Sequence, residues 1–174
     1  MGSFSKTFAS NGGFVGVRSR AVQQYLRYYG AAGTFSNGLS PIQAAVVLKA
    51  LRIVRSEEGA QRRKAMMDNS VFLRERLAAA GLEVYGEPSA IVAVKMGTEA
   101  LARLVSSEIA GMGLVANLVE FPAVPKGEAR FRLQVMAEHT KDELARAVVI
   151  MTQAVARASD RLQTICDPQQ RAVA

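Results

Sequence analysis

The spacing of the apolar residues changes at Gly81, and this change constrains the fold more than any other feature of the chain. Over residues 41–80, apolar side chains recur at intervals of three and four, which is the spacing of one face of an α-helix. After Gly81, short apolar runs are bounded by glycine and proline, as is typical of strands and turns. The pattern therefore predicts a long helical connector over residues 41–80, followed by a smaller domain that contains a sheet.

The segment after Gly81 has the order β-β-α-β-β-α. Thr98 is predicted to cap the first of its helices, and Thr140 with Glu143 has the spacing of a capping box at the start of the second. Along residues 129–136, apolar and polar side chains alternate, so one face of this strand is expected to be buried. This order predicts a small α+β domain, residues 81–163, in which helices pack on one face of a mainly antiparallel sheet. Strands are expected near residues 82–85, 90–96, 114–121 and 129–136, and residues 164–174 are expected to form a tail.

The start of the connector carries a strong helix signal. Ser40 is a favourable N-cap residue, and Pro41 is favourable at the first helical position. Gln43 stands three residues after Ser40, where its side chain can complete a capping box. Gly59 is a candidate break within the connector.

The first 40 residues do not have the pattern of a complete domain. Residues 14–17 predict a short buried strand, residues 19–29 have helical spacing, and residues 30–39 have the composition of a loop. We expect residues 1–40 to be a remnant of a larger sheet.

Composition restricts the environment of the chain. It has 174 residues, 49% hydrophobic and 21% charged, as in an ordinary globular protein. From the sequence we expect no secretory signal, and it contains no run of about 18 apolar residues such as a membrane helix needs. The single cysteine, Cys166, excludes an internal disulfide and fits a reducing cytoplasm, so we predict a cytoplasmic protein without a transmembrane segment. No catalytic role is predicted for this thiol, and no metal ligands are assigned.

The basic charge leaves one further hypothesis open. A formal net charge of +7 permits a nucleic-acid-binding domain, which would bind DNA or RNA in a salt-sensitive way. The densest basic run, residues 61–64, lies in a helical pattern beside Glu57 and Glu58, without interleaved aromatic residues. We therefore interpret it as a solvated helix face and predict no nucleic-acid partner. The excess charge also suits an anionic substrate such as an acyl-coenzyme A.

Residues 2–14 set Lys6 among glycines and small hydroxyl residues. A lysine that bonds to an aldehyde cofactor needs such a setting, because nearby hydroxyls can receive the phosphate of the cofactor. The stretch resembles the lysine motif of the α-oxoamine synthases, G-[TS]-F-[SG]-K-x-x-[AG]-x-x-G-G. These are pyridoxal-phosphate enzymes of the aminotransferase class I/II type and fold type I.

Two later segments resemble motifs of the same family. Residues 34–41 are similar to F-[ST]-[NT]-[ST]-[LM]-x-P, with Ser36 at a hydroxyl position and Gly38 where another hydroxyl is common. Residues 122–132 are similar to P-x-V-P-x-G-x-x-R-[LIF]-R, and an A-x-H-T run follows them, with Glu138 in place of a usual small residue. His139, the only histidine, is interpreted as structural rather than as the family's ring-stacking histidine.

The resemblance implies a fold, an activity and a set of site residues. The fold is α/β: the C-terminal part of a fold type I transferase, with a remnant of the large cofactor-binding domain (residues 1–40) before the connector and the small α+β domain. The implied enzyme is an acyltransferase that condenses an amino acid with an acyl-coenzyme A and releases carbon dioxide. Its cofactor is pyridoxal 5'-phosphate, and it is a homodimer with shared active sites. By resemblance, Lys6 is catalytic and binds the cofactor, Ser3 and Ser36 contact the phosphate, and Arg132 binds the substrate carboxylate.

Several alternatives remain open at this stage. The lysine motif lies at the N-terminus, so we expect an N-terminally incomplete enzyme, a non-catalytic fragment, or one half of a split enzyme. Another activity of the class I/II aminotransferase type is a further possibility. Serine palmitoyltransferase-like and 8-amino-7-oxononanoate synthase-like reactions are both compatible with the motifs.

Overall fold

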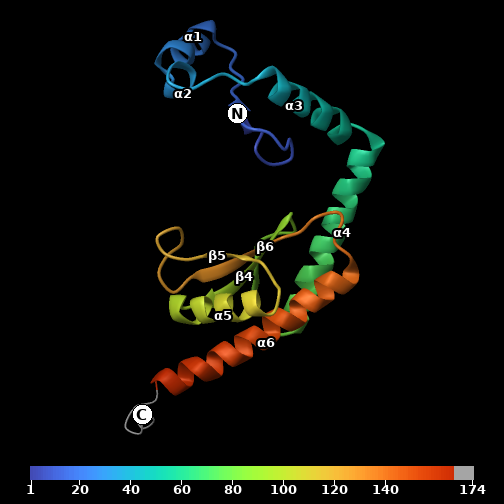
Figure 1. Cartoon of the computed structure of the whole chain (residues 1–174), viewed down its shortest axis with the longest axis vertical. Coiled ribbons are helices and arrows are strands. Elements are labelled where there is room, and N and C mark those ends of the chain that lie inside the picture. Colours follow the sequence, from blue (N-terminus) through green and yellow to red (C-terminus); the bar gives the residue numbers. More distant parts are fainter. Residues whose placement is uncertain (167–174) are drawn as a thin grey trace. The chain divides into compact units, whose positions relative to one another are not determined.

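The structure is a computed structural model that describes residues 1–166, and it divides into two compact units. The first unit spans Met1–Gln61, and the second begins at Arg62. Each unit contains one sheet, with two strands in the first and four in the second. Strands β4, β5 and β6 of the second sheet are labelled in Figure 1. The tail predicted at residues 164–174 lies outside the described residues from residue 167 onward.

Short, locally capped elements make up the first unit. At the start of the helix over residues 20–29, the Val22 N–H donates to Ser19 Oγ at 3.4 Å, which satisfies one of the free amides of the first turn. The segment predicted as a loop over residues 30–39 contains one additional short helix. The elements are β1 (Gly2–Ser3), β2 (Gly13–Phe14), α1 (Arg20–Tyr29), α2 (Ala31–Thr34) and α3 (Pro41–Val54).

The predicted capping box at the start of α3 is confirmed. The Gln43 N–H donates to Ser40 Oγ at 3.2 Å, and the Ser40 N–H donates to Gln43 Oε1 at 3.0 Å. Pro41 occupies the first turn, where its missing N–H removes no intrahelical bond. Residues that are neighbours in sequence therefore define this helix start.

In the described part of the chain, every buried hydrophobic side chain lies at Leu73 or later. The first unit therefore has no hydrophobic core of its own. The prediction of a buried strand at residues 14–17 is wrong: Phe14 is 53% exposed and Val15 is 59% exposed. A sheet of two short strands has no second layer to cover its apolar side chains. Phe14 instead packs against Phe4, with ring centroids 5.6 Å apart.

The long connector is two helices, and it breaks before Gly59. Helix α3 ends at Val54, and α4 spans Glu57–Ala79. Ser56 joins them: its Oγ donates to the Ile53 carbonyl at 2.7 Å and accepts from the Gly59 N–H at 3.3 Å. A Cβ on Gly59 would lie 2.2 Å from the Ile53 carbonyl oxygen, so glycine permits the close approach of the two helix ends.

The second unit has the predicted strand and helix order. Its sheet has the order β3-β4-β6-β5, and all neighbouring pairs are antiparallel. The long central pairing joins β4 to β6, with Val92 opposite Leu133 and Val94 opposite Phe131. The elements after α4 are β3 (Val84–Tyr85), β4 (Ile91–Gly97), α5 (Glu99–Gly111), β5 (Asn117–Val119), β6 (Ala129–Gln134) and α6 (Lys141–Cys166).

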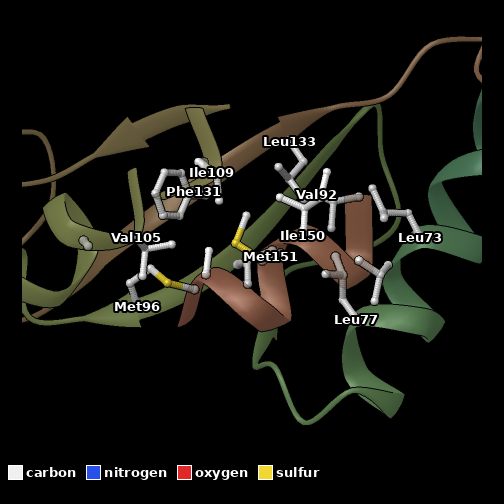
Figure 2. Close-up of a cluster of buried hydrophobic side chains, with 14 of the residues drawn as sticks. Leu73, Leu77, Val92, Met96, Val105, Ile109, Phe131, Leu133, Ile150 and Met151 are labelled. Atoms are coloured by element: carbon white, nitrogen blue, oxygen red, sulfur yellow. The ribbon is translucent and has the colours of Figure 1, made fainter. Parts of the chain in front are cut away.

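One face of β6 lies in the core, as the alternation predicted. Ala129, Phe131, Leu133 and Val135 are buried, whereas Arg132 and the other residues of the opposite face are half-buried or exposed. Phe131 is fully buried among side chains from α5 and α6, including Val105, Ile109 and Met151 (Figure 2). Helix α4 adds Leu73 and Leu77 to the same cluster. The helices therefore cover one face of the sheet and leave the other face open for polar side chains.

Strand β5 is shorter than the predicted residues 114–121. Gly113 has a φ of +82°, and the Leu114 N–H donates to the Ile109 carbonyl at 2.9 Å, so these residues complete the turn after α5. Pairing with β6 ends where Asn117 meets Arg132. Beyond Arg132, β6 has no ladder partner on this side.

We expect Gly59→Ala to loosen α3, although alanine normally stabilises a helix over glycine by about 0.5–1 kcal/mol. The clash with the Ile53 carbonyl should reverse the sign and cost about 1–3 kcal/mol. Hydrogen exchange of the amides of residues 41–61 measures the effect. Gly111→Ala is the matched control, because a Cβ there meets nothing within 4 Å. Slower exchange in Gly59→Ala would contradict the packing argument.

Candidate active site

Lys6 lies in the loop that joins β1 to β2. The Phe4 N–H donates to the Gly12 carbonyl, and the Ser10 N–H donates to the Phe4 carbonyl, both at 2.9 Å. Inside this closed loop, the Ala9 N–H donates to the Lys6 carbonyl at 2.9 Å, which makes a tight turn. Ala9 has a φ of +49°, a strained conformation that non-glycine residues adopt mainly at turns and functional sites.

Two serine hydroxyls lie at the base of the Lys6 loop. Ser3 Oγ and Ser5 Oγ are 2.7 Å apart, and the Ser5 N–H donates to Ser3 Oγ at 3.2 Å. Lys6, Ser3 and Ser5 are all exposed. Within the described residues, the Lys6 amine makes no side-chain hydrogen bond or ion pair. The loop thus carries Lys6 directly after a pair of hydrogen-bonded serines whose hydroxyls can donate to an anion.

Ser36 follows α2 in the same unit. Its hydroxyl donates to the Ala32 carbonyl one helical turn earlier, and its side chain is exposed. Among the described contacts, no hydrogen bond joins Ser36 to Ser3 or Lys6. Ser3 and Lys6 therefore belong to one closed loop, whereas no described contact links Ser36 to them within one chain.

Arg132 and Arg130 share one face of β6 but differ in their partners. The Arg130 guanidinium donates to the Glu128 carbonyl at 3.0 Å and lies 4.6 Å from the centre of the Tyr85 ring. Arg132 lies between Ala93 and Asn117 on the neighbouring strands. Its side chain is exposed and has no hydrogen bond or ion pair within the described residues. Arg132 is therefore free to bind a ligand, whereas Arg130 holds the sheet surface together.

A cavity of about 450 Å³ opens beside Arg132, where β6 extends past β5. Its polar lining includes Asn117, Gln134 and Arg146, and its apolar lining includes Leu114 and Ile150. This volume lies within the range of small-molecule sites, about 300–1,000 Å³.

Asn69 of α4 fixes the turn that follows β6. Its Nδ2 donates to the Met136 carbonyl at 3.1 Å and to the His139 carbonyl at 2.7 Å. The Met136 N–H donates to His139 Nδ1 at 3.3 Å, which agrees with a structural role for this histidine. Sequence reasoning missed Asn69, although a polar residue near Val71 and Leu73 in an apolar helix pattern is a usable signal.

The start of α6, at one side of the cavity, carries an ionised carboxylate. Glu143 Oε2 accepts from the Thr140 N–H at 2.8 Å and from the Thr140 hydroxyl at 3.0 Å. The Glu143 N–H donates to Thr140 Oγ1 at 3.2 Å, so the predicted capping box is confirmed. The backbone hydrogen bond from Thr140, followed by its hydroxyl, lowers the pKa of Glu143 from its usual value near 4.5.

The model for aminotransferase class I and II matches residues 1–150, most of the chain. The chain belongs to this family. It is 34% identical, over 82% of its length, to 2-amino-3-ketobutyrate coenzyme A ligase of Salmonella typhimurium, and covers 35% of that protein. It is 35% identical, over 87% of its length, to 8-amino-7-oxononanoate synthase of Trichlorobacter lovleyi, and covers 39% of that protein.

The chain also matches solved structures. One is a serine palmitoyltransferase described with pyridoxal phosphate as an internal aldimine, with a TM-score of 0.79 and 26% identity. The match covers 90% of this chain and 39% of that enzyme. The resemblance to α-oxoamine synthases, the fold type and pyridoxal phosphate as the family cofactor are confirmed. The chain spans less than half the length of these relatives.

Two classes of feature were not found in the described part of this family member. No described helix is long and apolar enough to cross a membrane. No group of three or more histidine, cysteine, aspartate or glutamate side chains in residues 1–166 is arranged to hold a metal ion.

The lowered pKa of Glu143 predicts a pH-dependent contribution to stability. The contribution is present above the usual glutamate pKa and is lost as the pH falls through the lower folded-state pKa. The difference in unfolding free energy between the wild type and Glu143→Gln should therefore be larger at pH 7 than at pH 3 in urea unfolding. As a control, Thr140→Val should move the Glu143 pKa, followed by NMR, only part of the way back, because the backbone donor remains. An equal difference at both pH values would contradict the prediction.

Proposed function

We propose that the chain carries the lysine, phosphate-binding and carboxylate-binding residues of a pyridoxal-phosphate-dependent acyltransferase. The reaction condenses an amino acid with an acyl-coenzyme A and releases carbon dioxide. The observation that carries this proposal is the closed loop between β1 and β2, which contains Lys6 directly after the paired hydroxyls of Ser3 and Ser5.

The donor set of the loop fits the cofactor. The Lys6 amine suits its aldehyde, and the hydroxyl of Ser3 suits its phosphate. When bound, the cofactor supplies an electron sink for the charge that develops at the substrate α-carbon. Lys6 then holds the cofactor and moves protons at that carbon. In the proposed homodimer, Ser36 of the partner subunit completes the phosphate contacts, so each active site is shared.

Arg132 is proposed to bind and orient the carboxylate of the amino acid. A guanidinium fork matches two carboxylate oxygens, and the Arg132 side chain is not engaged elsewhere in residues 1–166. Arg130 cannot serve equally, because Glu128 and the Tyr85 ring already hold it.

The proposal does not specify which amino acid or which acyl group the enzyme uses. The named relatives include a 2-amino-3-ketobutyrate coenzyme A ligase, an 8-amino-7-oxononanoate synthase and serine palmitoyltransferases. We infer that the chain corresponds to the C-terminal part of such an enzyme and acts in the cytoplasm. A half of a split enzyme, a non-catalytic fragment and another class I/II aminotransferase activity are the competing proposals.

Reductive labelling tests the role of Lys6. With pyridoxal phosphate and borohydride, we expect a stoichiometric adduct on Lys6, found by peptide mapping, and less of it in Ser3→Ala. Lys49→Ala is the control, since Lys49 is also exposed but lies in α3. Scattered labelling of many lysines would instead favour the split-enzyme proposal.

Amino-acid binding to the pyridoxal-phosphate-loaded chain tests Arg132. Arg132→Gln should weaken binding by roughly 10–100-fold, the usual worth of hydrogen bonds between charged groups. Titration of serine, glycine and alanine, followed by absorbance, measures the affinity. Arg130→Gln removes the same charge from the same strand face and should affect stability more than affinity. Equal losses of affinity in both variants would contradict the proposal that Arg132, rather than Arg130, binds the substrate carboxylate.

A further inference from the structure

The cavity beside β6 has apolar walls that belong to the hydrophobic core of the second unit. Leu73, Leu133, Leu144 and Ile150 line it, and each is less than 9% exposed. Leu73, Leu133 and Ile150 lie together at one end of the core cluster in Figure 2. These residues come from α4, β6 and α6, so the walls are set by the packed fold.

The polar residues around the cavity favour an anion. Arg132 and Arg146 both line it, and neither guanidinium has a hydrogen bond or ion pair within the described residues. The carboxylate that lines it, Glu143, is turned to the N–H and hydroxyl of Thr140. A cationic ligand would meet two guanidinium groups and one occupied carboxylate, whereas an anionic ligand would find free donors.

Helix geometry places charge and apolar surface next to each other. Arg146 and Ile150 are four residues apart on α6, and Leu144 and Ala147 are three apart, so each pair shares a face of the helix. A ligand that reaches the Arg146 guanidinium can therefore lay an apolar tail along Ala147 and Ile150. Burial of such a tail removes apolar surface from water and adds to the attraction of the head group.

We propose that this cavity binds a monocarboxylate with an unbranched aliphatic tail. The carboxylate pairs with the Arg146 guanidinium, and the tail lies against Leu144, Ala147 and Ile150. The site needs neither Lys6 nor pyridoxal phosphate, although Arg132, the proposed carboxylate-binding residue of the acyltransferase, also lines the cavity. Its test uses no cofactor and targets Arg146, so its failure can be distinguished from failure of the proposed acyltransferase activity, which is tested at Lys6 and Arg132.

Octanoate binding to the full 174-residue chain tests the proposal by calorimetry and by amide chemical shifts. Octanoate is expected to bind, with shifts confined to the cavity lining at residue 73 and within residues 113–117, 132–139 and 143–150. Acetate has the same head group without a tail, and octylammonium has the same tail with the opposite charge. Both are expected to bind at least about tenfold more weakly than octanoate.

Two variants and one control separate the charge from the shape of the cavity. Arg146→Gln removes the head-group partner, and Ala147→Leu fills part of the tail site; each should weaken octanoate binding by about fivefold or more. Arg157→Gln makes the same charge change on α6 outside the cavity lining and should leave binding within about twofold.

Three results would overturn the proposal. One is a wild-type chain that binds octanoate no better than acetate. Another is Arg157→Gln weakening binding as much as Arg146→Gln, which would indicate a general charge effect. The third is chemical shifts that map to the exposed apolar residues of α1 and α3 instead of the cavity.

Discussion

The pairing of β4 with β6 is the constraint on which the second unit depends. Side chains on a strand point alternately to its two faces, so the register that buries Phe131 also presents Arg132 on the open face. A slip of one residue would place guanidinium groups in the core and phenylalanine in water. The packing of α5 and α6 against Phe131 thus specifies the face of β6 on which Arg132 lies.

The same register separates two arginines that look equivalent in sequence. Arg130 is held by Glu128 and the Tyr85 ring, whereas Arg132 lies at the last pairing with β5 and has no such neighbours. The short β5 is important here, because the turn after α5 uses Gly113 and Leu114 and leaves the end of β6 uncovered. The cavity and the free Arg132 guanidinium both follow from the late start of β5, at Asn117.

Features defined by neighbouring residues could be predicted from the sequence. The capping boxes at Ser40 and Thr140 depend on contacts three residues apart, and the alternation of β6 depends on period two. Features that join distant segments could not be predicted. The exposure of Phe14 reflects the absence of a covering layer. The cavity combines residues from α4, β6 and α6, and no local pattern indicates that they meet.

Helix formation and core formation occur in different parts of this chain. Helices α1 and α3 have well-formed N-caps, but the described hydrophobic core begins only at Leu73. Cooperative melting depends on the burial of apolar surface, whereas circular dichroism records backbone conformation wherever it occurs. A calorimeter would therefore register chiefly the sheet and the helices packed on it. A spectropolarimeter would also record α1 and α3, so the two melting curves of the same sample need not coincide.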